Sequence, residues 1–249
     1  MLNAVALDSS GGLVAAPNYD GGICIWNTLD GLQVTTLTGH LRIVSNLAFS
    51  NNKYLLASGS NDYTVCLWNL EQGNKAIWSR EFDYTTECIT ISPDSTLLAL
   101  ATKYVDIILL DIATGATTKV LKGHSATVRS VAFTSESQTL ASSSADGTVR
   151  LWNIESGLEV RQFNSKSKAD FNCVAVSPDG KYIAAGDWDG RLYLWQINDT
   201  KPSPFMKIRS HTKLISSIAF SPDGKWLVSS SWDKTICVTN FNEFTRIHE

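Results

Sequence analysis

The chain has 249 residues and a formal net charge of −3. This balance lacks the basic footprint of proteins that bind nucleic acid or anionic lipid, so we expect no direct nucleic-acid partner. No apolar run approaches the roughly 20 residues that span a bilayer, and the first residues lack the positive segment of a secretory signal. An intracellular location, cytoplasmic or nuclear, without a membrane span is predicted.

One pattern of short alternating apolar runs recurs six times along the chain. Period-two alternation bounded by Gly, Asp and Ser is typical of half-buried strands. A repeat of about 40–45 residues with four strands is the propeller period. The third run of each repeat ends at a column spaced by 42 to 44 positions: Trp26, Trp68, Leu110, Trp152, Trp195 and Thr239. The pattern predicts one domain over 1–249, with repeats at about 1–39, 40–81, 82–123, 124–166, 167–210 and 211–249.

The repeats differ in how complete they are. The first is predicted to hold strands near 4–7, 13–16, 23–26 and 34–37, and it lacks the Gly-His segment because that position would precede Met1. The second and fourth repeats are complete. The third has lost the polar columns, although strands are expected near 88–91, 97–101 and 106–110. The fifth keeps Asp189 and Trp195, and the sixth ends on a strand expected at 244–247.

A complete repeat carries Gly-His and then Leu-Ala-Ser-x-Ser-x-Asp-x-Thr-Val-x-Leu-Trp-Asn, and two other repeats carry Ser-Pro-Asp-Gly turns. This pattern resembles the WD-repeat family over essentially the whole chain. The resemblance implies an all-β fold, a six-bladed WD-repeat β-propeller with four antiparallel strands per blade. A fold does not by itself specify a function, so the resemblance leaves the biochemical role open.

The resemblance also implies two structural tetrads. In the family, a His, a Ser or Thr, an Asp and a Trp form a hydrogen-bonded chain that holds the loops of one blade together. Such a buried chain is favourable only when every member is satisfied, so we expect the incomplete third and fifth repeats to be less rigid. The two sets implied here are His40, Ser58, Asp62 and Trp68, and His124, Ser142, Asp146 and Trp152.

Closure of the ring is a separate question. Many family members pair an N-terminal strand with the last blade, but Met1 lies almost at the first strand of the first repeat. We therefore expect a closed ring in which the sixth repeat supplies its own four strands. The alternatives are a fragment of a longer protein and an open, incomplete propeller whose missing surface a partner chain covers.

The sequence contains no recognisable catalytic or metal-binding pattern. It lacks G-x-S-x-G, a phosphate-binding glycine loop and H-E-x-x-H, and three of its four histidines lie in the repeat column. The five cysteines fall in strand columns without zinc spacing, which is typical of small buried residues. We expect no catalytic residue, no metal and no cofactor. A propeller enzyme with a site in the central channel remains the alternative, and it would need convergent titratable groups there.

The residue before each turn Asp is the most informative about function. In this fold the turn between the second and third strands points to one rim, and an Asp turned inward to hold the loop leaves its predecessor exposed. Adding positions at the start of the first strands gives a candidate partner-binding rim of Tyr19, Asn61, Lys103, Arg129, Asn172, Trp188 and Trp232.

The aromatic members of this rim predict a binding surface. Exposed aromatics are enriched at interaction hot spots, and Tyr19, Trp188 and Trp232 would form one arc in a closed ring. The alternative is that each tryptophan packs on its neighbour and buries itself. The sequence therefore favours a non-catalytic scaffold or adaptor that binds a protein or peptide, as part of a multi-protein complex, on one rim.

Overall fold

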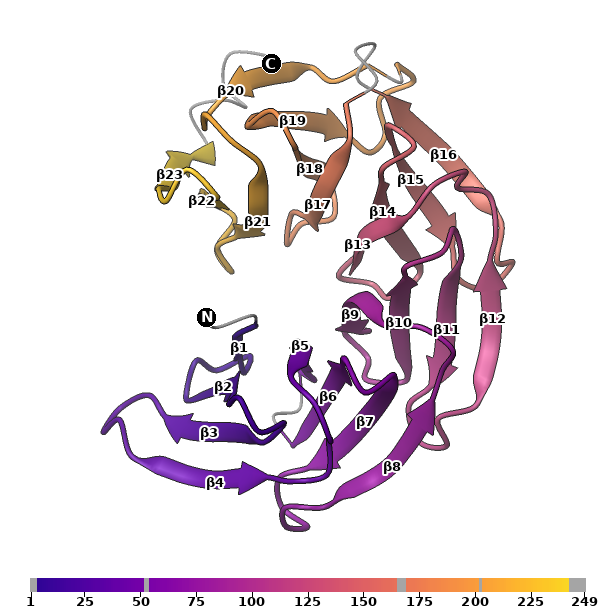
Figure 1. The fold of residues 1–249 in the computed structure, drawn as a ribbon. Coiled ribbons are helices and arrows are strands. Elements are labelled where there is room, and N and C mark those ends of the chain that lie inside the picture. Colours follow the sequence, from indigo (N-terminus) through magenta and orange to yellow (C-terminus); the bar gives the residue numbers. More distant parts are fainter. Residues whose placement is uncertain (1–3, 52–53, 165–168, 202, 242–249) are drawn as a thin grey trace. The chain divides into compact units, whose positions relative to one another are not determined.

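The structure is a computed structural model that describes residues 4–51, 54–164, 169–201 and 203–241. Its elements within these ranges are strands that form six antiparallel sheets, which we call blades one to six in chain order. In each blade the strands lie side by side in the order of the chain (Figure 1). The described residues include no helix long and apolar enough to cross a membrane.

Blades one to three have four strands each. Blade one contains β1 (Ala6–Leu7), β2 (Leu13–Pro17), β3 (Ile23–Asn27) and β4 (Gln33–Leu37). Blade two contains β5 (Val44–Phe49), β6 (Leu55–Ser60), β7 (Thr64–Asn69) and β8 (Ala76–Glu81). Blade three contains β9 (Thr86–Ile91), β10 (Leu97–Thr102), β11 (Ile107–Asp111) and β12 (Thr117–Leu121).

Blades four and five also have four strands, and three strands of blade six are described. Blade four contains β13 (Val128–Phe133), β14 (Thr139–Ser144), β15 (Thr148–Asn153) and β16 (Glu159–Asn164). Blade five contains β17 (Phe171–Val176), β18 (Tyr182–Asp187), β19 (Arg191–Gln196) and β20 (Met206–Arg209). Blade six contains β21 (Ile215–Phe220), β22 (Trp226–Ser231) and β23 (Ile236–Asn240).

Local sequence explains the hairpins that join the first two strands of blades five and six. Between β17 and β18 the Ser177 hydroxyl donates to the Asp179 carboxylate at 2.5 Å, and Gly180 N donates to Ser177 O at 2.9 Å. Gly180 has a φ of 69°, which a residue without a Cβ adopts at no steric cost. The Ser-Pro-Asp-Gly sequence therefore encodes a tight hairpin, and the same bonds recur at Ser221 and Asp223.

The core lies between successive blades rather than inside any one of them. The chain divides into two compact units, residues 1–120 and 121–249. In the first unit Ile23 and Ile25 of blade one pack with Leu56 of blade two, and a second cluster joins blades two and three. In the second unit one cluster joins blades four and five, and another joins five and six. Each sheet thus buries a face against its neighbour, which is how repeat folds are stabilised.

The predicted fold class is confirmed: the chain is all-β, with six blades of the WD-repeat β-propeller type, one per repeat. The strands predicted for the first and third repeats agree with β1–β4 and β9–β11 to within three residues. The strand expected at 244–247 lies outside the described residues.

Candidate functional site

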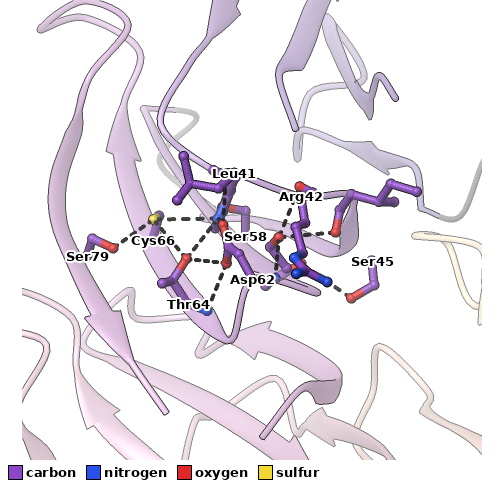
Figure 2. A network of polar contacts seen from close by, with 12 residues as sticks. Leu41, Arg42, Ser45, Ser58, Asp62, Thr64, Cys66 and Ser79 are labelled. Atoms are coloured by element: carbon purple, nitrogen blue, oxygen red, sulfur yellow. Dashed lines mark hydrogen bonds and ion pairs between the residues drawn. The ribbon is translucent and has the colours of Figure 1, made fainter. Parts of the chain in front are cut away.

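In blade two the four tetrad residues form a continuous hydrogen-bonded chain. Trp68 Nε1 donates to Ser58 Oγ at 2.8 Å, and Ser58 Oγ lies 2.7 Å from His40 Nε2. On the other side of the ring, His40 Nδ1 lies 3.1 Å from Asp62 Oδ2. Asp62 also accepts from Leu41 N at 2.7 Å, so its carboxylate ties the turn before β7 to the loop before β5 (Figure 2).

A threonine extends this chain in a way that the tetrad prediction missed. Thr64 donates its hydroxyl to Asp62 Oδ1 at 2.6 Å and also lies 2.9 Å from His40 Nδ1. Figure 2 shows Thr64 between Asp62 and Cys66, whose thiol contacts the Ser79 hydroxyl of β8. The Thr of the Asp-x-Thr motif is the sequence signal for this role.

Blade four repeats the chain, and blade six repeats most of it. Trp152 Nε1 donates to Ser142 Oγ at 2.8 Å, and His124 bridges Ser142 and Asp146 at 2.7 and 2.8 Å. In blade six the matching bridge of His211, Ser229 and Asp233 has distances of 2.9 and 3.2 Å. Because Thr239 replaces the tryptophan there, the chain in blade six ends at the serine.

The environment sets the protonation of these groups. Burial lowers the pKa of His40, and the neighbouring Asp62 carboxylate only partly offsets it. Burial opposes ionisation of Asp62, but hydrogen bonds from Thr64 and from Leu41 N outweigh it, so the pKa of Asp62 lies below its usual range. Asp146 follows the same logic, with bonds from His124 and Thr148 outweighing burial to lower its pKa. These carboxylates are therefore held ionised as structural acceptors.

The prediction that the Asp before the third strand holds the turn is wrong for blades one and five. In blade five the side chain of Asp189 is 66% exposed, whereas that of Asp187 is buried. Asp187 Oδ1 accepts from Asp189 N at 2.9 Å and from Arg191 N at 2.7 Å, and Asp187 Oδ2 accepts from the Tyr193 hydroxyl at 2.9 Å. In blade five the carboxylate of Asp187, two positions earlier, therefore holds the turn as Asp62 does in blade two.

Blade one uses an amide at the same position. Asn18 Oδ1 accepts from Asp20 N at 3.0 Å and from Gly22 N at 2.8 Å, while Asp20 itself is exposed. Asn18 and Asp187 each lie eight residues before their Trp column, where the complete blades have Ser60 and Ser144. The sequence signal for this role is a polar residue in that column. The prediction missed it because both blades also have an Asp in the expected column.

Aromatic packing replaces the polar chain at the centre of blade five. Ala185 stands where blades two and four have serine, so the buried Trp195 Nε1 has no hydrogen-bond partner among the described residues. Tyr193 stacks on Trp195 with ring centroids 5.8 Å apart, and Phe171 meets Trp195 edge-on at 5.7 Å. Blade five therefore gains apolar contacts where it lacks the serine and histidine.

The turns of blades five and six bring Trp188 and Trp232 together. Gly190 has a φ of 80°, and its backbone approaches the His211 loop so closely that a Cβ there would overlap His211 O. His211 N donates to Gly190 O at 3.0 Å, which fixes the two turns beside one another. As a result the two tryptophan rings lie with centroids 6.5 Å apart.

The tryptophans touch each other without burying each other. Trp188 remains 44% exposed and Trp232 65% exposed. The Arg129 guanidinium lies 5.4 Å from the Trp188 ring centroid, in the geometry of a cation–π contact. The three side chains form a continuous surface, which we call the tryptophan rim.

Two polar groups lie at the edge of the tryptophan rim. Asn172 donates from Nδ2 to Ile215 O at 3.1 Å, which ties β17 to β21. Trp188 N donates to Asp170 O at 3.1 Å. Burial raises the pKa of Asp170, opposed by Arg129 and reinforced by Asp187. Neither Arg129 Nε nor Asp170 Oδ1 has a partner among the described residues.

The candidate rim residues of the first unit are also exposed. Tyr19 is 74% exposed, and Asn61 and Lys103 lie at the surface of the turns in blades two and three. Blade three adds an aromatic pair that sequence reasoning missed, since Tyr84 meets Tyr104 edge-on with centroids 5.1 Å apart. These residues belong to residues 1–120, whereas the tryptophan rim belongs to residues 121–249.

No His, Cys, Asp and Glu cluster suited to a metal ion occurs among the described residues. The five cysteines all lie among the described residues, and none of them forms a disulfide. Most of the acidic and histidine side chains described above hold turns, whereas Asp20 and Asp189 are exposed and Asp170 Oδ1 has no partner among the described residues. The tryptophan rim, by contrast, leaves a large aromatic surface exposed.

A family model named "WD domain, G-beta repeat" matches residues 31–69, 115–153, 157–196 and 202–240, well over half of the chain. Periodic tryptophan protein 2 of Arabidopsis thaliana is 31% identical over 202 residues, which are 78% of this chain and 22% of that protein. THO complex subunit 6 of Homo sapiens is 25% identical over 83% of this chain and 67% of its own length. A guanine nucleotide-binding protein subunit beta of Oryza sativa subsp. japonica is 26% identical over 74% of this chain and 52% of its own. The chain thus spans about a fifth of the first of these relatives.

Proposed function

The chain belongs to the WD-repeat family, and from that premise we propose that it is a non-catalytic, intracellular scaffold or adaptor that binds a protein or peptide. The binding surface is the tryptophan rim of blades four to six, formed by Arg129, Trp188 and Trp232. The contact between two half-exposed tryptophans is the observation that carries the proposal. A pair of large apolar rings left in water is unusual for a surface without a partner.

The energetics of recognition favour this surface. Trp offers a large contact area at low conformational cost, because only two torsions have to be fixed on binding. Backbone hydrogen bonds hold the two turns, the rings contact each other, and Arg129 adds a charged donor beside Trp188. A preorganised anchor of this kind loses little entropy when a partner docks.

Two relatives are named as subunits of larger assemblies, a THO complex subunit and a guanine nucleotide-binding protein subunit. This supports the proposal that the present chain also acts within a multi-protein complex. The exposed rim of the first unit, with Tyr19, Asn61 and Lys103, is a second proposed contact surface.

The test is affinity capture from the native source with wild-type protein and with the Trp188→Ala, Trp232→Ala double variant. We expect partners captured by the wild type to be lost with the double variant, while its thermal unfolding midpoint stays within a few degrees. Trp226→Ala is the matched control, since Trp226 is 43% exposed on β22 and lies outside the turns that carry Trp188 and Trp232. Partners that are retained by the double variant, or lost equally with the control, would contradict the proposal.

A further inference from the structure

Around the tryptophan rim, most acidic side chains are buried, whereas several basic side chains are exposed. The acidic residues of the surrounding turns are mostly withdrawn: the side chains of Asp146, Asp187 and Asp233 are 4%, 1% and 9% exposed, and each accepts backbone hydrogen bonds. Asp189 is exposed but forms an ion pair with Arg191. Among the described residues of these turns, little unpaired negative charge therefore faces solvent; the carboxylate of Asp170 is half-buried and lies near Arg129.

Cationic side chains in the same turns remain exposed. Lys234 follows Trp232 by two residues, and its backbone N donates to Ser231 O at 3.0 Å. Lys213 lies across the turn, because the Ser231 hydroxyl donates to Lys213 O at 3.1 Å and Trp232 N donates to Leu214 O at 3.1 Å. Both lysine side chains are exposed, and Arg129 lies on the other side of the pair, against Trp188.

From this arrangement we infer that the tryptophan rim binds an acidic linear segment, in which an aromatic or large aliphatic residue docks on Trp188 and Trp232 while flanking Asp or Glu residues pair with Arg129, Lys213 and Lys234. This inference rests on the proposed function and adds the chemistry of the partner. The apolar rings supply the anchor. The cations on both sides set the orientation and accelerate association with a segment of opposite charge.

A single-stranded nucleic acid would also find cations and stacking surfaces here. A peptide fits better, because nucleic-acid surfaces carry a track of cations along the backbone path. This chain has a net charge of −3, and its described residues place two lysines beside the pair. The oligonucleotide is therefore an outcome to be tested against.

The experiment begins with a phage-displayed library of random 12-residue peptides selected on the full chain. Clones that also bind the Trp188→Ala, Trp232→Ala variant are removed. We expect the remaining clones to be enriched in Asp and Glu around an aromatic or large aliphatic residue. A synthetic peptide from this set, labelled for fluorescence anisotropy, should bind about tenfold or more weakly when its acids are replaced by Asn and Gln.

Charge reversal on the protein provides the matched comparison. Lys213→Glu with Lys234→Glu should weaken the peptide by about tenfold or more, and raising the salt concentration should weaken wild-type binding in the same direction. Lys181→Glu with Lys225→Glu makes the same change of net charge at the exposed hairpins before β18 and β22. This control should change the affinity by about twofold or less.

The possible results separate the two claims. Selected peptides that are basic or without charge preference, yet depend on the tryptophans, overturn the inference about charge and leave the proposed rim intact. Tighter binding of a twelve-residue oligothymidine than of any peptide also overturns it. Recovery of no clone that depends on Trp188 and Trp232 overturns the rim and the inference together.

Discussion

At the scale of single residues, one hydroxyl oxygen determines whether the buried indole nitrogen at the centre of a blade is hydrogen-bonded. Ser58 and Ser142 each receive the indole N–H of their tryptophan and contact the histidine, whereas Ala185 leaves Trp195 Nε1 without a partner among the described residues. Blade five compensates with stacked aromatic rings. The same position is thus part of a polar chain in blades two, four and six and part of an apolar cluster in blade five.

Exchanging these residues tests that contrast. Ser142→Ala should lower the free energy of unfolding by about 1–3 kcal/mol, because it leaves two buried nitrogen atoms unpaired. Ala185→Ser is the reciprocal control and should be nearly neutral, since it satisfies Trp195 Nε1 but adds a buried hydroxyl hydrogen. Urea denaturation measures both. Equal losses of unfolding free energy in the two variants would show that the hydrogen bonds of the Ser142 hydroxyl add no measurable stability.

The buried histidine predicts a dependence of stability on pH. Burial lowers the pKa of His40 in the folded state from 6.5, so below about pH 6.5 the unfolded chain binds a proton that the folded chain does not. The free energy of unfolding should therefore fall between pH 7 and 5 more steeply in the wild type than in His40→Gln. Below that range both proteins should lose stability again. The pKa of Asp146 and Asp233 is lower in the folded than in the unfolded chain, so at acidic pH the unfolded chain takes up their protons first.

Urea denaturation at several pH values measures this slope, and the two proteins should differ mainly between pH 7 and 5. Parallel curves for the wild type and His40→Gln over this interval would contradict the assignment of His40 as a buried neutral acceptor and donor.

At the scale of the elements, the strands and hairpins could be predicted because alternation and the Ser-Pro-Asp-Gly signal are local. The holders of the turns in blades one and five could not, because the apparent turn residues Asp20 and Asp189 fill the expected column while Asn18 and Asp187 accept the hydrogen bonds. Which of two acceptors turns inward depends on burial in the folded blade. Predicting these acceptors requires a second polar column, eight residues before the tryptophan, where Asn18 and Asp187 lie.

The packing of one blade on the next depends on small residues in the second strand. Gly186 of β18 faces β21, and a Cβ there would lie 2.7 Å from Ile215 and 2.9 Å from the Cys173 sulfur. Gly186→Ala should cost on the order of 1–3 kcal/mol, because the blades would have to move apart. Hydrogen exchange in β17 and β21 should accelerate as well.

Ser143→Ala is the control at the corresponding position of blade four. It removes a buried hydroxyl that has no hydrogen-bond partner among the described residues, so it should cost little or nothing. A Gly186 variant as stable as this control would show that the approach of β21 to β18 relaxes easily.

At the scale of the whole molecule, the period of 42–44 residues predicted the number and order of the blades correctly. It also placed Trp188 and Trp232 in neighbouring turns of the second unit, and the structure adds that the rings touch and that Arg129 lies over one of them. Neither contact could be derived from spacing, since each depends on side-chain torsions. The aromatic pair of Tyr84 and Tyr104 has no counterpart in the repeat and was therefore missed.

The assignment of residues 1–249 to one domain is itself a prediction that unfolding can test. Truncating the buried Trp152 to Ala should cost about 3–5 kcal/mol. In a single cooperative domain, this loss should shift one urea transition that tryptophan fluorescence and far-ultraviolet circular dichroism report together. Two separate transitions, of which the variant shifts only one, would instead mark residues 1–120 and 121–249 as independent folding units.

The most direct test of the central claim is the affinity of one purified partner, first identified by capture, for wild-type protein and for the Trp188→Ala, Trp232→Ala variant. The account predicts a loss of about 2 kcal/mol or more, roughly thirtyfold in the dissociation constant, with a nearly unchanged unfolding midpoint. Trp226→Ala should bind like the wild type. An unchanged affinity in the double variant, or a loss that only follows its unfolding, would contradict the claim that the tryptophan rim is the binding surface.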